Sequence, residues 1–129
     1  MRAPIATIIA ALAIFSITTT RASDREEQFR AALRAWQPGF FRGDIVVRGP
    51  LSVAAIEREG LQEVRNCHHC PQVPFGYANR YWNHFKRELR AGDALIFFHS
   101  ERKGEFGLLE GYAIIRNGKV WKSMAGKIS

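Results

Sequence analysis

Apolar residues recur with a helical period between positions 24 and 36. Charged residues separate them, and four apolar side chains stand at positions i, i+3, i+4 and i+7, which is the spacing of one helix face. These side chains are Phe29, Ala32, Leu33 and Trp36. A Pro-Gly pair follows the run, so we predict an amphipathic helix over residues 24–36.

A short strand and a short helix are predicted next along the chain. Ile45, Val46 and Val47 stand between two glycines and predict a strand over residues 44–48. Ser52 is a favourable N-cap, and it predicts a helix that continues through Arg58. We expect Gly60 to end this helix in the left-handed conformation.

The longest amphipathic pattern runs from Tyr77 to Ala91 and stops at Gly92. We predict a helix here because its apolar residues fall on one face and its basic residues on the other. The apolar residues are Ala78, Tyr81, Trp82, Phe85 and Leu89.

The C-terminal part of the chain predicts strands. Residues 94–98 form a continuous apolar run, and a charged loop is expected over residues 99–107. Two further apolar segments, residues 111–116 and 119–124, flank Asn117-Gly118. An Asn-Gly pair between two such segments is the strongest short-range signal for a β-hairpin.

These elements together predict a small α+β fold in which helices pack on one face of an antiparallel sheet. The order is helix, strand, two helices, strand and hairpin. The predicted core consists of Phe29, Leu33, Trp36, Trp82, Phe85, Leu89, Ile96, Phe98, Ile114 and Val120.

The first 22 residues have the layout of a cleavable signal peptide. Arg2 precedes an apolar run that ends near Ile17, and Thr20 and Ala22 suit the two recognition sites of a signal peptidase. A retained membrane anchor is the alternative, but the run is shorter than the roughly 20 residues that span a bilayer. Removing residues 1–22 from 129 leaves 107, so we predict one small globular domain over residues 23–129 in the periplasm or outside the cell.

The chain is basic, with 19 Lys and Arg against 12 Asp and Glu. Arg2 and Arg21 lie in the predicted signal, which leaves 17 against 12 and a net charge of +5 in the mature domain. An exported basic protein meets a protein partner or an anionic envelope component more readily than nucleic acid. The alternative is that the charge serves solubility.

The basic face of the predicted second amphipathic helix is a candidate interaction surface. Its members are Arg80, Lys86, Arg87 and Arg90. A second basic set joins it if the fold brings the two together, and otherwise both are solvated faces. The second set is Arg102, Lys103, Lys119, Lys122 and Lys127. Four aromatics outside the periodic faces serve either as contact residues or as core. They are Phe40, Phe41, Phe75 and Tyr77.

The segment Cys67-His68-His69-Cys70 invites three chemical interpretations. The first is a structural disulfide between Cys67 and Cys70, since an exported protein meets oxidising conditions. The second is a zinc or copper site, in which both cysteines and His69 act with His84 from a distance. The third is a redox centre, although two prolines directly after the motif argue against the helix start that such centres use. On the first interpretation no cofactor is expected.

Residues 90–100, RAGDALIFFHS, and residues 111–120, GYAIIRNGKV, resemble a group of short, mostly uncharacterised bacterial proteins. These proteins share a Gly-Asp-led strand and a Gly-Tyr-Ala to Arg-Asn-Gly hairpin. The resemblance implies a sheet and a turn, with Asp93 setting the turn before its strand, and it implies no activity.

The leading functional expectation is an exported, non-enzymatic binding protein, such as a periplasmic inhibitor or an immunity-type protein that covers a partner's active site. It rests on small size, the signal, positive charge and the lack of a recognisable catalytic motif in the sequence. A metal-binding envelope protein and a thiol-disulfide oxidoreductase stay open as alternatives. A protruding CHHC loop flanked by exposed aromatic and Arg side chains would favour the binding protein.

Overall fold

The structure is a computed structural model that describes residues 24–39, 41, 43–101 and 108–128. The predicted signal peptide, residues 1–22, lies outside the described residues. Phe40 and basic residues Arg102 and Lys103 of the predicted charged loop do so as well. Within the described ranges, no helix combines the length and the apolar character needed to cross a membrane.

Four strands form one antiparallel sheet in the order β1-β2-β3-β4. They are β1 (Ile45–Arg48), β2 (Ala94–Glu101), β3 (Leu108–Arg116) and β4 (Lys119–Ile128). The predicted strands and hairpin are therefore confirmed. β2 runs three residues further than predicted, because residues up to Glu101 still pair with β3.

The turn between β3 and β4 is built by the Asn-Gly pair. Asn117 has φ 53° and Gly118 has φ 75°, so both central residues take the left-handed conformation that a type I′ hairpin requires. The hairpin is irregular at two points, between Glu110 and Gly111 and between Ile114 and Ile115, where β4 carries an extra residue. Such bulges increase the local twist of a sheet.

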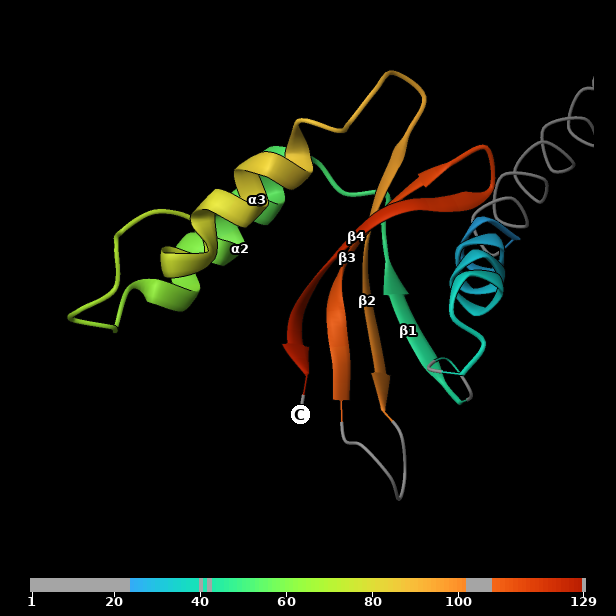
Figure 1. Cartoon of the computed structure of the whole chain (residues 1–129), viewed down its shortest axis with the longest axis horizontal. Helices are drawn as coiled ribbons and strands as arrows, with labels where there is room; N and C mark the ends of the chain where they lie inside the picture. Colours follow the sequence, from blue (N-terminus) through green and yellow to red (C-terminus); the bar gives the residue numbers. More distant parts are fainter. Residues whose placement is uncertain (1–23, 40, 42, 102–107, 129) are drawn as a thin grey trace, which may run out of the picture.

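The predicted α+β class with a small antiparallel sheet is confirmed, but the helices cover both faces of the sheet instead of one (Figure 1). Residues 24–36 form a helix that packs on the face of Ile96 and Phe98. α2 (Val53–Val64) and α3 (Asn79–Lys86) pack on the face of Leu95 and Ile114. β2 is therefore buried on both faces, which explains why its apolar residues run continuously and do not alternate with polar ones.

Two apolar clusters result, one on each face of the sheet. Most of the predicted core residues are buried in one of them, whereas Leu89 and Val120 are only partly buried against their edges. The prediction is wrong for Trp36, whose exposed fraction is 37%. Phe41 contacts Phe98 with ring centroids 5.5 Å apart, and Trp36 lies outside it, 6.2 Å from the Phe41 ring.

α2 begins where the sequence predicts and ends later. The Ser52 hydroxyl accepts a hydrogen bond from the Ala55 amide at 3.1 Å, as expected of an N-cap. Gly60, however, is buried inside the helix and does not end it. A Cβ at this position would lie 3.0–3.1 Å from ring atoms of Phe75. Gly60 is therefore explained by close packing and not by a left-handed cap.

α3 is shorter than predicted. A turn of 3-10 helix, η1 (Gly76–Ala78), precedes it, and the α-helix ends at Lys86 instead of Ala91. The Arg116 guanidinium donates a hydrogen bond to the carbonyl of Glu88 at 2.9 Å. A residue of β3 thus provides the hydrogen-bond donor for the Glu88 carbonyl. The chain then passes through the turn at Asp93 into β2.

Asp93 and Arg116 tie the end of the helical segment to the hairpin. Arg116 donates to both carboxylate oxygens of Asp93, at 2.9 and 2.8 Å, and the Arg90 amide donates to one of them at 2.8 Å. The exposed fractions of the Asp93 and Arg116 side chains are 2% and 16%. The hydrogen bonds from Arg116 hold the pKa of Asp93 below its usual value. The expected role of Asp93 in the turn before β2 is thus confirmed.

We predict that Asp93→Asn lowers the Tm by about 5–10 °C near neutral pH, because Arg116 loses its charged partner. Since folding lowers the pKa of Asp93, its contribution is complete above the unfolded pKa of about 4 and is lost as the pH falls through the folded pKa. Thermal melts from neutral to acidic pH measure this. The gap between wild type and variant should narrow below about pH 4, and a constant gap would contradict the assignment.

We predict that Gly111→Ala destabilises the protein by about 2–3 kcal/mol. A Cβ on Gly111 would overlap the Met124 carbonyl oxygen and lie 2.8 Å from the Ala125 Cα, so backbone has to move. Urea unfolding measures the change. Gly39→Ala is the control, since no described atom lies within 4 Å of a Cβ there, and equal effects of the two changes would contradict the prediction.

Candidate interaction surface

The CHHC motif lies in the loop between α2 and η1. Cys67 and Cys70 form a disulfide with Cα atoms 5.4 Å apart, as the first of the three sequence interpretations predicts. The loop sits at the end of the α2/α3 pair that points away from the sheet, at the left of Figure 1. His68 and His69 are exposed between the two cysteines.

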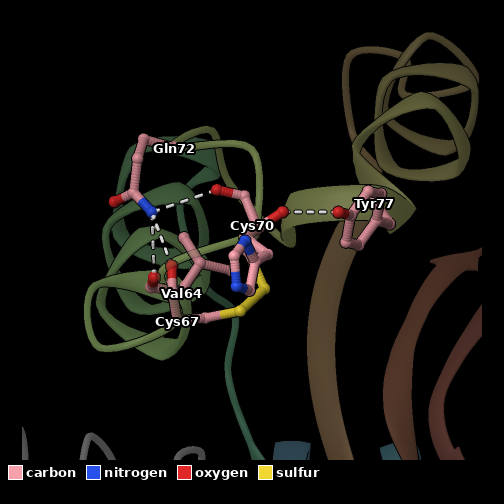
Figure 2. The surroundings of a disulfide bond; sticks show 6 residues. Val64, Cys67, Cys70, Gln72 and Tyr77 are labelled. Atoms are coloured by element: carbon pink, nitrogen blue, oxygen red, sulfur yellow. Dashed lines mark hydrogen bonds between the residues drawn. A yellow bond between two sulfur atoms is a disulfide. The ribbon is translucent and has the colours of Figure 1, made fainter.

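Gln72 holds this loop together from within. Its side-chain amide nitrogen donates to the carbonyls of Val64, Cys67 and Cys70, at 3.1, 3.3 and 3.2 Å (Figure 2). The first of these carbonyls belongs to the last turn of α2, whose carbonyls lack partners within the helix. One polar side chain thus joins the end of α2 to both sides of the disulfide.

Phe75 attaches the loop to the core. Its backbone is left-handed, with φ 66°, a conformation that costs a non-glycine residue about 1–2 kcal/mol. The Phe75 amide donates to the Gly60 carbonyl at 3.1 Å, and its ring lies 5.4 Å from Trp82 and 5.8 Å from Tyr112. These contacts offset the strain and fix the point at which the loop leaves the core.

Tyr112 packs against the Phe75 ring, and its hydroxyl stays protonated near neutral pH. Burial raises its pKa to about 12, and the negative charge of Glu59 adds to the shift. Its hydroxyl donates to Glu59 at 3.5 Å. A tyrosine with so high a pKa keeps its proton near neutral pH, so it serves here as a core side chain.

One exposed tyrosine contacts the loop, and a second exposed tyrosine and an arginine follow it on α3. Tyr77 is 72% exposed and Tyr81 is 57% exposed. The Tyr77 hydroxyl donates to the His69 carbonyl (Figure 2). Arg80 donates to the Tyr81 hydroxyl at 2.8 Å, and its guanidinium lies 4.8 Å from the ring centre. We refer to His68, His69, Tyr77, Arg80 and Tyr81 as the loop surface.

The four basic residues predicted as one interaction surface are divided in the structure. Arg80 belongs to the loop surface, whereas Lys86 faces α2 and pairs with Glu57 at 3.2 Å. Arg87 and Arg90 are exposed beyond the end of α3. On a helix that continues to Ala91 all four would share one face. Within the observed α3, Lys86 already turns toward Glu57 of α2, and the end of the helix at Lys86 leaves Arg87 and Arg90 outside it.

A groove between α3 and β4 adjoins the loop surface. It encloses about 570 Å³ and is lined from the helix by Arg80, Tyr81 and His84 and from the strand mainly by Lys122 and Met124. The sequence leaves open whether the fold brings the second basic set to the helix, and the structure places Lys122 and Arg80 on the lining of the same groove. The side chain of Lys127, like Arg102 and Lys103, lies outside the described residues.

The residues of the zinc or copper interpretation are not gathered in this form of the protein. Cys67 and Cys70 are bonded to each other, and His84 lies in the groove. Among the described residues, no group of three or more His, Cys, Asp and Glu side chains is placed to hold a metal ion. Metal binding through this set would require reduction of the disulfide and movement of the loop.

The position of the motif also bears on the redox interpretation. Cys67 follows the C-terminal end of α2, and its amide donates to the Val64 carbonyl at 3.1 Å. The C-terminal end of a helix carries partial negative charge. Redox-active cysteines are instead stabilised as thiolates at helix N-termini, so this position disfavours a reactive thiolate at Cys67.

Sequence reasoning did not identify three sets of residues in the loop and the groove. Gln72 has no pattern that marks it as the loop's hydrogen-bond donor. Tyr81 has helical spacing with the core residues Trp82 and Phe85, so the pattern assigns it to the apolar face of the helix and does not mark it as exposed. Ser123 and Met124 are strand residues whose place opposite α3 depends on the tertiary fold. The exposed Tyr77, by contrast, was recognisable as an aromatic residue outside the periodic faces.

No family model, curated protein or solved structure matches the chain. Function is therefore inferred from the chemistry of the loop surface and the groove.

We predict that Gln72→Ala increases hydrogen exchange at the Cys67 amide by about three- to tenfold, because three carbonyls lose a donor. The global Tm should change little, since the loop lies outside the core. Hydrogen-deuterium exchange measured by NMR tests this. Gln62→Ala on the exposed side of α2 is the matched control, and equal protection in both variants would contradict the role of Gln72.

Proposed function

We propose that the chain is an exported, non-enzymatic binding protein of the inhibitor or immunity type, and that it contacts a protein partner through the loop surface. One observation carries this proposal: the exposed Tyr77 side chain is bonded to a loop held by a disulfide and by Gln72, and the exposed Arg80 and Tyr81 follow it in the first turn of α3. A CHHC loop flanked by exposed aromatic and Arg side chains is the feature that, on the sequence-based prediction, favours a binding protein.

The residue types suit an interface. Tyr and Arg are enriched among the residues that contribute most to protein–protein binding, since they bring a large contact area with few rotatable bonds. The Tyr77 hydroxyl is already bonded to the loop, and Arg80 is stacked on Tyr81. Less side-chain freedom is then lost on binding, which improves affinity for a given area.

The chemistry of the partner follows from charge. The loop surface contains two histidines and Arg80 and no carboxylate, so we infer an acidic contact region on the partner protein. The predicted signal peptide implies that the chain and its partner bind each other outside the cytoplasm. A disulfide is consistent with that setting, where oxidising conditions preserve it.

We predict that Tyr77→Ala combined with Tyr81→Ala weakens the partner complex by about 30-fold or more, as expected when hot-spot residues are truncated. The full chain is expressed with a C-terminal tag in its own cells and recovered from the envelope fraction. Native mass spectrometry identifies the bound protein, and titration with the purified partner gives its Kd. Val46→Ala is the control, since Val46 is an exposed apolar residue on β1, remote from the loop.

The same spectra distinguish the alternatives. A bare chain with one zinc or copper ion, lost on Cys67→Ser and Cys70→Ser replacement, would contradict the proposal and support the metal site of Cys67, His69, Cys70 and His84. Turnover of a dithiol or disulfide substrate would support the oxidoreductase. A partner whose affinity is unchanged by the tyrosine replacements would place the interface elsewhere and overturn the role of the loop surface.

A further inference from the structure

The groove between α3 and β4 has an apolar base and a cationic rim. Its base is formed by Phe85 and Met124 with two alanines, Ala78 and Ala125. Polar and basic side chains surround this base. They belong to Arg80, Tyr81, His84, Lys122 and Ser123. None of the described residues that line the groove is acidic, so the charged side chains of its lining attract an anionic group.

The volume of the groove suits a small ligand. Its 570 Å³ falls within the range of about 300–1,000 Å³ that is typical of small-molecule sites. Such sites combine apolar walls with a few polar groups that orient the ligand, and this is the composition found here.

Lys122, which lines the groove, already has an anionic partner. Lys122 pairs with Glu88 at 3.6 Å, and a hydrogen bond from Trp121 and the charge of Lys122 lower the pKa of Glu88. Both groups of this pair are more than a third exposed, so an incoming anion can replace Glu88 at Lys122 at small cost.

A neighbouring cavity of about 260 Å³ shares Ala78, Met124 and Ala125 with the groove and is lined by Glu63 and Glu110. These carboxylates repel an anion. An anionic head group is therefore favoured at Arg80 and Lys122, with its hydrocarbon part lying over Met124 and Ala125.

We propose that this groove binds a small amphipathic anion, meaning one acidic head group on a short hydrocarbon body, such as a medium-chain carboxylate. The proposal goes beyond partner binding and does not depend on it. Arg80 and Tyr81 belong to both surfaces, so a bound anion would alter the side chains that the loop surface presents.

The test uses the full mature protein and decanoate below its micelle concentration, with isothermal titration calorimetry near neutral pH. We expect saturable one-to-one binding. Arg80→Gln and Lys122→Gln should each weaken it by about threefold, as for an exposed ion pair, and together by about tenfold. Arg58→Gln is the matched control, since it removes one exposed positive charge from α2 outside the groove. Met124→Glu should abolish binding while the Tm shows that the variant folds.

Several results would overturn the proposal. If decyltrimethylammonium binds as tightly as decanoate, or if the double variant keeps its affinity, the groove binds any apolar chain and does not discriminate by charge. No saturable binding of decanoate would exclude the ligand class. Sedimentation of a dimer that Met124→Glu dissociates and that decanoate leaves intact would assign the groove to a second copy of the chain. The results with decanoate and decyltrimethylammonium leave the partner titration unaffected, so the two proposals fail separately, whereas a dimer through the groove would also cover Arg80 and Tyr81.

Discussion

The ring of Phe75 rests on the bare Cα of Gly60, and the arrangement of the whole helical side depends on that contact. A side chain on Gly60 would come within 3.1 Å of the ring, so the close approach requires glycine although glycine weakens a helix. In return, Phe75 packs against Trp82 and Tyr112, each such aromatic pair contributing about 0.5–1.5 kcal/mol. The contact joins α2, α3 and β3 at one point.

The loop surface is a consequence of this anchor. Because Phe75 is held in the core, the ten residues between α2 and the anchor must turn outward and close on themselves. The disulfide and the Gln72 amide close them locally. A loop with only two residues between its cysteines gains little stability from the chain entropy that the cross-link removes. We therefore regard the disulfide and Gln72 as devices that set the shape of the loop more than the stability of the domain.

A second constraint, the Asp93 and Arg116 pair, positions the groove. It ends the helical segment early and holds the hairpin against it, while Trp121 lies over the Arg116 guanidinium with its ring centre 4.3 Å away. β4 is thereby placed opposite α3, so that Lys122 and Arg80 line the same groove. The two candidate surfaces thus depend on two separate links between helices and sheet, and they meet at Arg80 and Tyr81.

Local patterns in the sequence determined the elements that have local causes. The helix over residues 24–36, the Ser52 cap, the strand of β2 and the Asn117-Gly118 hairpin all follow from spacing or backbone preference within a few residues, and all are confirmed. The tertiary structure decided what depends on contacts between distant residues. It placed Gly60 inside α2 against Phe75, joined Arg116 to the segment that follows α3, exposed Tyr81 and Trp36, and put helices on both faces of the sheet. Periodicity reports that a side chain is apolar, but only its neighbours in space decide whether it is buried, exposed for binding, or placed opposite a charge.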